Sequence, residues 1–337
     1  MPIFGPGKKN TATAVGKMAR VPRPRAAARL PEPRTVAGDG DAELRALLRL
    51  ADSRDWPALR AGLARHSGHD LSSLIAGVCA KSLMLSDWLP EAAGKDPEDA
   101  LAAAFLGAAT VERAWRVRTN RLARQVSADQ FREFHEVLRE AEEHLYRSAE
   151  LDPESAAPWC SLLVSGRGLQ VGPDIQQRRF EAAIERSPGH LGAHNQMLQQ
   201  LCRKWSGSHE RMHAFATEAM RGPYGDELGV LIPRAYYEHF VQLGKDSPER
   251  GFITSAESRA ELQEAADRTV FRPGYRPARG PYAAANVFAW VFTSAGMRPQ
   301  ARAAYAATEG VVVNWAGFVD PVAAYTRQRN LAYQLKS

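Results

Sequence analysis

The fold is decided by three proline-containing turns, AELDPESAAPW (residues 149–159), IERSPGHLGAH (residues 184–194) and MRGPYGDELGV (residues 220–230). Their prolines are spaced 35 residues apart, at Pro153, Pro188 and Pro223. A proline ends a helix because its ring clashes with the preceding turn and because it has no N–H to donate. Repeats of about 20 to 50 residues are typical of stacked helical hairpins. We therefore expect successive second helices of such hairpins to end near Leu151, Arg186 and Arg221.

The residues that precede each proline also repeat. Small residues at such positions let two helices approach closely, and large residues fill the gap to the next hairpin. The repeated positions are Ser148, Ala183 and Glu218, then Leu145, Phe180 and Phe215, and then Ala141, Gln176 and Arg211. A C-terminal unit lacks the closing proline but keeps the pattern, with Gly296 at the turn, through Ala289, Phe292, Ala301, Tyr305 and Thr308.

This pattern is similar to the second helix of a tetratricopeptide repeat, from which Gln176, Arg211 and Glu218 depart by their size. The stretch QQLCRKWSGSHERMHAFA (residues 199–216) resembles a family of uncharacterised repeat proteins from high-GC bacteria. That resemblance implies a repeat fold and no particular activity. The residues that carry it are Lys204, Trp205, Gly207, Ser208, Glu210, Met212, Phe215 and Ala216.

We therefore expect an all-α fold, with a tetratricopeptide-like right-handed array of stacked helical hairpins over residues 98–337. Residues 41–97 are expected to form an N-terminal helical bundle or cap, because their apolar residues recur at helical spacing. The run Val311–Val313 is too short to carry a sheet. The expected helices outside the repeats cover residues 42–50, 56–64, 71–85, 96–115, 127–151 and 321–335.

Two helices have more specific expectations. Asp96 and Pro97 are a favourable start for the helix at 96–115, because proline suits the first helical position. Its expected apolar stripe is Leu101, Ala104, Phe105, Ala108, Val111 and Trp115. The next helix opens at Ser127 or Ala128, and its expected buried face is Phe131, Phe134, Leu138, Ala141, Leu145 and Ser148.

The positive charge is concentrated in the first 38 residues, which contain eight basic residues and one acidic residue, Glu32. Their net charge of +7 leaves the rest of the chain at −1, since the whole chain carries +6. Prolines and glycines interleave these charges, so residues 1–40 are expected to be a disordered basic arm. Electrostatic attachment of residues 1–38 to nucleic acid or an anionic surface is one possible function, and a solvated tail is the simpler alternative.

The composition, 45% apolar and 24% charged, is ordinary for a globular protein. The sequence has no run of about 18 apolar residues and no secretory h-region, so a cytoplasmic protein without a transmembrane segment is expected. Cys79, Cys160 and Cys202 are too few and too widely spaced for a zinc ribbon or a disulfide framework. We expect them to be reduced, mostly buried thiols.

One motif with catalytic potential is His209-Glu210-Arg211-Met212-His213, which matches the H-E-x-x-H pattern of zinc metallopeptidases. Histidines four residues apart on a helix share a face and can bind one zinc ion, while the glutamate activates a water molecule. Glu238 or His239 lies at a plausible distance for a third ligand. Against this hypothesis, Ser208 is expected to be a helix N-cap that places His209 in the first turn, and Arg211 adds a positive charge beside the site.

The window from residue 190 to residue 213 is rich in metal-ligating side chains, namely His190, His194, Cys202, His209 and His213. A structural or regulatory metal there is one interpretation. The alternative is that His194 holds the inward position that Trp159 holds one repeat earlier, where it packs and forms hydrogen bonds.

The preferred interpretation is a non-catalytic interaction or scaffold protein that needs no cofactor and binds another protein, as a peptide or partner helix, in a helical-repeat groove. The alternatives are a zinc-dependent metallohydrolase that uses Glu210 with His209 and His213, and a nucleic-acid-associated protein that uses the basic arm. The expected partner-binding residues are Trp159, Leu163, His194, Gln196, Gln200 and Tyr236.

Overall fold

The computed structural model describes residues 30–118, 127–205, 207–244, 246–277, 279–315 and 319–335. Within these ranges the chain forms sixteen α-helices, together with short 3₁₀ segments and no β-strand. The prediction of an all-α fold is therefore confirmed.

The N-terminal bundle consists of α1 (Ala42–Asp52), α2 (Trp56–Leu63), α3 (Gly68–Lys81) and α4 (Leu85–Ala93). Asp41 caps α1 by accepting hydrogen bonds from the backbone N–H groups of Glu43 and Leu44. Leu59 and Leu63 are fully buried in the core of the bundle, and burying a leucine contributes roughly 2 kcal/mol. Three of these helices were expected, whereas α4 was not: α3 ends earlier than expected, and a separate helix follows.

The central helices are α5 (Ala100–Arg118), α6 (Ala128–Leu151), α7 (Ala157–Leu169), α8 (Pro173–Arg186), α9 (Leu191–Gln200) and α10 (His209–Arg221). Three of them, α6, α8 and α10, end two residues before Pro153, Pro188 and Pro223, which confirms the expected helix ends. The residue between the helix and each proline leaves the helical conformation, because the proline ring disfavours that conformation in the preceding residue.

The start of α5 corrects the sequence-based expectation. The carboxylate of Asp99 accepts hydrogen bonds from the backbone N–H groups of Leu101 and Ala102 at 3.1 and 3.2 Å, so the helix begins after Asp99 rather than at Asp96. The expected single apolar stripe is also too narrow, because α5 packs against α3, α4, α6 and α7 and is buried on most sides.

The expectations for α6 are met, except that Phe131 is only partly buried. Ser127 caps the helix in a capping box with Gln130. The buried residues of α6 all belong to the expected face and are Phe134, Leu138, Ala141, Leu145 and Ser148. The contact between α6 and α5 is close at Gly107, where a Cβ atom would lie 2.5 Å from Cγ of Leu145.

The C-terminal half contains α11 (Gly225–Leu228), α12 (Leu231–Gln242), α13 (Ala256–Arg268), α14 (Ala283–Ser294), α15 (Arg298–Ala307) and α16 (Pro321–Tyr333). Gly296, with φ +70°, makes the turn between α14 and α15, as the sequence predicts. The residues expected to pack this last hairpin are at most 2% exposed, and they are Ala289, Phe292, Ala301, Tyr305 and Thr308.

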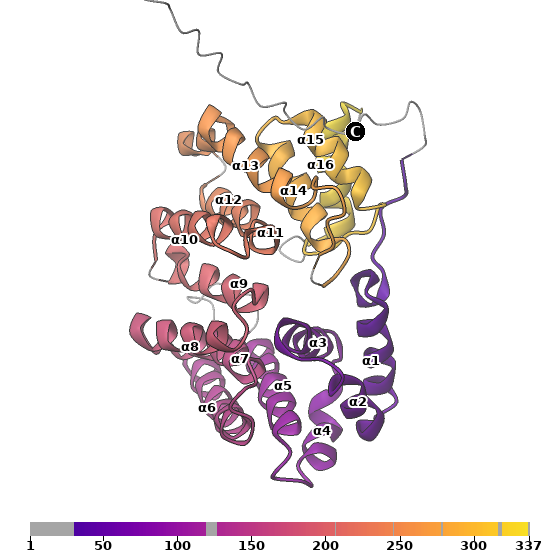
Figure 1. Cartoon of the computed structure of the whole chain (residues 1–337), viewed down its shortest axis with the longest axis vertical. Helices are drawn as coiled ribbons and strands as arrows, with labels where there is room; N and C mark the ends of the chain where they lie inside the picture. The colour runs from indigo at the N-terminus through magenta and orange to yellow at the C-terminus, as the bar shows by residue number, and fades with distance from the viewer. Residues whose placement is uncertain are drawn as a thin grey trace, which may run out of the picture.

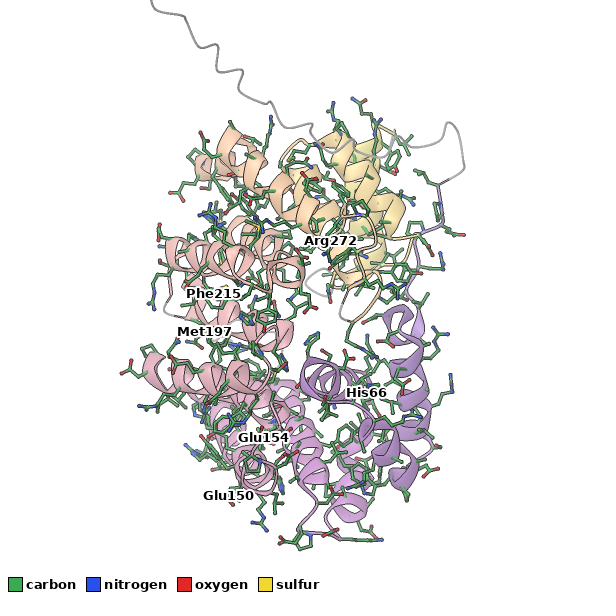
Figure 2. All side chains as sticks on the ribbon, viewed as in Figure 1. His66, Glu150, Glu154, Met197, Phe215 and Arg272 are labelled. Carbon is green, nitrogen blue, oxygen red and sulfur yellow. The ribbon has the colours of Figure 1, made fainter. Side chains whose placement is uncertain are left out.

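The helices follow a curved path in Figure 1, from α1–α4 at the lower right, through α6–α10 at the left, to α14–α16 at the upper right. Most consecutive helices contact each other along this path. Helices further apart in the chain also pack together, since α7 contacts α5 and α9, and α12 contacts α9 and α14. Apolar side chains such as Met197 of α9 and Phe215 of α10 (Figure 2) fill the spaces between the helices.

Residues 30–41, which we call the strap, correct the predicted boundary of the N-terminal arm. The backbone of Arg34 donates to Gly310 O and accepts from Val312 N, both at 2.9 Å. The Arg329 guanidinium donates to Pro31 O at 2.6 Å. The strap thus runs from the C-terminal helices to α1 (Figure 1), and residues 30–40 belong to the folded body. Residues 1–29 lie outside the described residues.

Candidate functional site

The most developed site is a pocket of about 240 Å³, which we call the inner pocket. It lies between α9, α12, α14 and the segment that follows α15, so it is built from three helices that neighbour one another along the path of the chain. Its lining combines amide, charged and aromatic side chains, and the lining residues are Asn195, Gln199, Arg234, Tyr237, Glu238, Asn286, Val287, Trp290, Val313, Asn314 and Trp315.

One wall of the inner pocket is held in place by Asn286, a buried residue of α14. Its amide nitrogen donates to Val311 O at 2.9 Å, and its amide oxygen accepts from Val313 N at 3.3 Å and from Trp315 Nε1 at 2.9 Å. These bonds fix the segment 311–315 against α14. Every polar group of Asn286 is used in building this wall.

Glu238 supplies the only carboxylate in the lining of the inner pocket. It accepts a hydrogen bond from Gln199 Nε2 at 2.8 Å and forms an ion pair with Lys204 Nζ at 2.8 Å. Its charge is therefore already compensated. Gln199 engages Oε1 of Glu238 and Lys204 engages Oε2, and no hydrogen bond or ion pair joins Glu238 to Arg234.

Arg234 is the basic residue in the lining of the inner pocket. Among the described residues its guanidinium has no hydrogen bond and no ion pair. Burial lowers the pKa of Arg234 to about 10, because the charged form is poorly solvated at this position. Burial, followed by the positive charges of Arg234 and Arg279, lowers the pKa of His69 to about 4. Arg279 itself is paired with Asp41.

Arg167 of α7 is a second partly buried arginine. Burial lowers the pKa of Arg167 to about 10, and its side chain donates to Gln196 Oε1 at 3.0 Å. The guanidinium also lies about 6 Å from the ring centres of Trp115 and Trp205, at 6.0 and 5.8 Å. Unlike Arg234, it is thus held by hydrogen bonds and by aromatic faces, which attract cations.

The expected partner-binding residues differ in burial: three are partly buried, and three are buried in the core. Gln196 and Gln200 reach polar neighbours, respectively Arg167 and Gln176. Trp159 is partly buried against the core. The other three are buried, so their side chains belong to the core of the array, and they are Leu163, His194 and Tyr236.

The packing alternative for His194 is the one that the structure supports. Its ring contacts Phe180 edge-on at 5.0 Å, and its Nδ1 lies 3.0 Å from His190 O. His190 in turn contacts Ser72, and Cys202 contacts Leu198 O. His190, His194 and Cys202 are therefore each engaged with different neighbours.

The histidines of the H-E-x-x-H motif come together with His239 of α12. Nε2 of His213 lies 3.2 Å from Nδ1 of His239, and the ring of His209 stacks on that of His239 at 3.7 Å. Glu238 is turned away toward Lys204, and Glu210 is exposed at the start of α10. Within the described ranges, no group of three or more His, Cys, Asp or Glu side chains is arranged to hold a metal ion.

The three clustered histidines are disposed to be neutral. Burial, with a smaller contribution from His209 and His213, lowers the pKa of His239 to about 4. Burial also lowers the pKa of His209 and of His213. Ser208 caps α10, as expected, so that His209 is the first residue of the helix.

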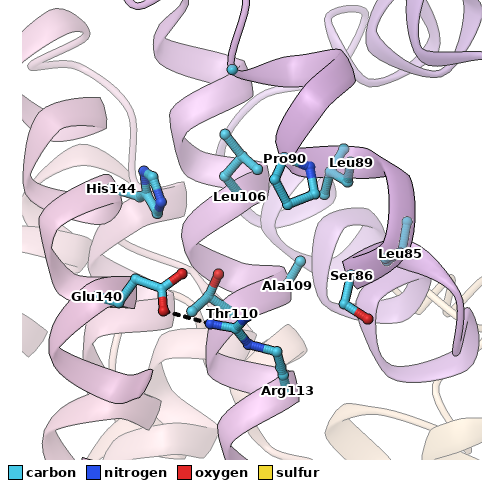
Figure 3. A pocket seen from close by; sticks show the side chains of 11 residues that line it. Leu85, Ser86, Leu89, Pro90, Leu106, Ala109, Thr110, Arg113, Glu140 and His144 are labelled. Carbon is cyan, nitrogen blue, oxygen red and sulfur yellow. Dashed lines mark hydrogen bonds and ion pairs between the residues drawn. The ribbon is translucent and has the colours of Figure 1, made fainter. Parts of the chain in front are cut away.

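Two other pockets carry no unmatched charge of this kind. In the pocket of about 110 Å³ between α4, α5 and α6 (Figure 3), Arg113 is paired with Glu140. In the pocket of about 370 Å³ beside the N-terminal bundle, Arg60 is paired with Asp99. The inner pocket therefore remains the best candidate for ligand binding.

Sequence reasoning missed Arg234, although one signal was available. The residue stands in LIPRAYYEHF (residues 231–240), where it is the only basic residue other than histidine in a largely apolar segment. The sequence could not show that, within the described residues, no carboxylate forms an ion pair with it.

Comparison of the chain with known protein families, curated proteins and solved structures gave no match. None of the helices in the described residues is both long enough and apolar enough to span a membrane.

Proposed function

We propose that this protein is a tetratricopeptide-like interaction or scaffold protein that binds a peptide or partner helix on the side of the array formed by α7, α9, α12 and α14. The repeat assignment is supported by the helix ends at the three prolines and by the contacts of α7 with α9, α9 with α12 and α12 with α14. In stacked hairpins, such first helices form the concave, partner-binding side.

The observation that carries this proposal is the pair of uncommitted amides in the inner pocket. The side chains of Asn195 and Asn314 form no hydrogen bond with the described residues. An amide side chain both donates and accepts, so it can pair with a peptide bond of a partner. Val287 and Trp290 offer apolar surface beside these amides, and this combination suits a short peptide segment.

The test is selection of binders from a random peptide library against the folded protein. Val287→Arg places a long side chain in the inner pocket, and we expect it to weaken the selected peptides about ten-fold or more. Ile175→Arg, an exposed residue of α8, is the matched control and should have no effect. Selected peptides whose affinity is unchanged by Val287→Arg would contradict the proposal.

A further inference from the structure

The charge of Arg234 indicates which kind of ligand the inner pocket binds, and this inference rests on the proposed function. Taking a charged group out of water is costly unless an opposite charge or hydrogen bonds compensate it. Arg234 is only partly withdrawn from water, and it has neither of these partners among the described residues. Arg234 lies on α12, between α9 and α14, and lines the inner pocket. A negatively charged group bound in this pocket can therefore pair with it.

No acidic side chain in the lining of the inner pocket is paired with Arg234. The carboxylate of Glu238 is bound to Lys204 and Gln199. The carboxylate of Asp41, which lies close to Arg279, is paired with that arginine at 2.5 Å. The pocket therefore contains one uncompensated cation whose partner is missing from the described chain.

We infer that the inner pocket recognises a carboxylate of the bound peptide, which pairs with Arg234 while a neighbouring apolar side chain packs on Trp290 and Val287. One guanidinium matches one carboxylate, because its fork of N–H groups can donate to both oxygens. A doubly charged phosphate would keep one charge uncompensated at this site. Asn195 and Asn314 then pair with the peptide backbone on either side of the acidic group.

The inference is tested with three N-acetylated peptides, one neutral and two that each add a single carboxylate to it. They are N-acetyl-Leu-Glu-Leu-amide, its Leu-Gln-Leu twin, and N-acetyl-Leu-Gln-Leu with a free terminal carboxylate. Binding to the full-length protein is followed through the indole N–H signals of Trp290 and Trp315 in NMR spectra, assigned with Trp290→Phe and Trp315→Phe. We expect one of the two peptides with a carboxylate to shift these signals at an about ten-fold lower concentration than the neutral twin.

The Arg234→Gln variant should bind all three peptides as weakly as the wild type binds the neutral twin, and Arg234→Lys should keep part of the difference. Arg276→Gln replaces an exposed arginine that does not line the inner pocket; it is the control and should behave as the wild type. Which of the two acidic peptides binds better identifies the carboxylate as a side chain or a chain end.

Equal titration by acidic and neutral peptides, no binding by any of the three, or no effect of Arg234→Gln would overturn the inference. The proposed function is decided separately, by the library selection. Selected peptides that lose affinity with Val287→Arg but not with Arg234→Gln would keep the proposed function and reject the carboxylate.

Discussion

At the residue scale, Arg167 and Arg234 share a depressed pKa caused by burial, yet their surroundings differ. Arg167 rests on Trp115 and Trp205 and donates to Gln196. Arg234 has no such support among the described residues. The contacts of Arg167 with the aromatic rings and with Gln196 explain how its charge is stabilised within the fold. Arg234 has no such contacts in the described part of the chain, and we therefore infer that a ligand supplies its partner.

The buried histidines predict how stability depends on pH. His190 is fully buried, and burial, followed by the charge of His69, lowers the pKa of His190 to about 3. In the unfolded chain its pKa is about 6.5, so below that pH the unfolded state binds more protons. The free energy of unfolding should therefore be at its maximum above about pH 6.5 and fall as the pH is lowered toward 3.

We expect His190 to account for a loss of roughly 2 kcal/mol between pH 7.5 and pH 5. His190→Asn keeps an acceptor for Ala193 N, which the imidazole now caps, but cannot take up a proton. Urea unfolding at the two pH values should show a smaller loss for this variant. His144→Asn in α6 is the control, and an equal reduction of the loss by this control would contradict the assignment to His190.

At the scale of elements, helix ends follow local rules, while the distance between helices depends on single residues at the contact. The contact between α5 and α6 passes through Gly107, which faces the fully buried Leu145. This glycine lies in the interior of a helix, where alanine is intrinsically better by about 1 kcal/mol. Its presence is therefore explained by the close approach of α6.

Gly107→Ala should destabilise the protein by roughly 1–2 kcal/mol in spite of the better helix propensity, because overpacking costs more than the propensity contributes. Thermal unfolding followed by circular dichroism gives the measurement. Gly251→Ala is the matched control, since a Cβ atom there meets no atom within 4 Å. A Gly107→Ala protein as stable as the wild type would show that α5 and α6 can separate at little cost.

At the scale of the whole molecule, the strap links the two ends of the helical path. It pairs with residues 310 and 312, and the next residues, Val313–Trp315, form a wall of the inner pocket. Asp41, at the end of the strap, is paired with Arg279 before α14. The N-terminal segment thus supports the wall of a pocket that is remote from it in sequence.

Two truncations separate the strap from the residues before it. Removing residues 1–29 should change the melting temperature by no more than about one or two degrees, because a chain end without a core contributes little. Removing residues 1–40 should cost roughly 2 kcal/mol, since it also breaks the backbone bonds of Arg34 and the bond from Arg329 to Pro31. Equal melting temperatures for the two truncated proteins would show that the strap is dispensable.

The sequence by itself determined the helices and most of their ends. Pro153, Pro188 and Pro223 act on the residues directly before them, and Ser127 and Ser208 cap helices through N–H groups three residues away. The buried face of α6 could be predicted because its apolar residues recur with the 3.6-residue period of a helix. Proline, cap and periodicity signals all lie within a few residues of the feature that they determine. The start of α5 was missed because Asp96 and Asp99 are both suitable caps, and the contact of Asp99 with Arg60 is not local.

The tertiary structure alone decided the inner pocket, the role of the strap and the separation of the expected partner-binding residues. Each depends on residues distant in sequence, as Arg34 and Val312 or Lys204 and Glu238 illustrate. The charge of Arg234 is visible in the sequence, but its lack of a partner among the described residues depends on how the surrounding helices pack. Such a property is set by the burial and pairing of the surrounding charges, which no local pattern encodes.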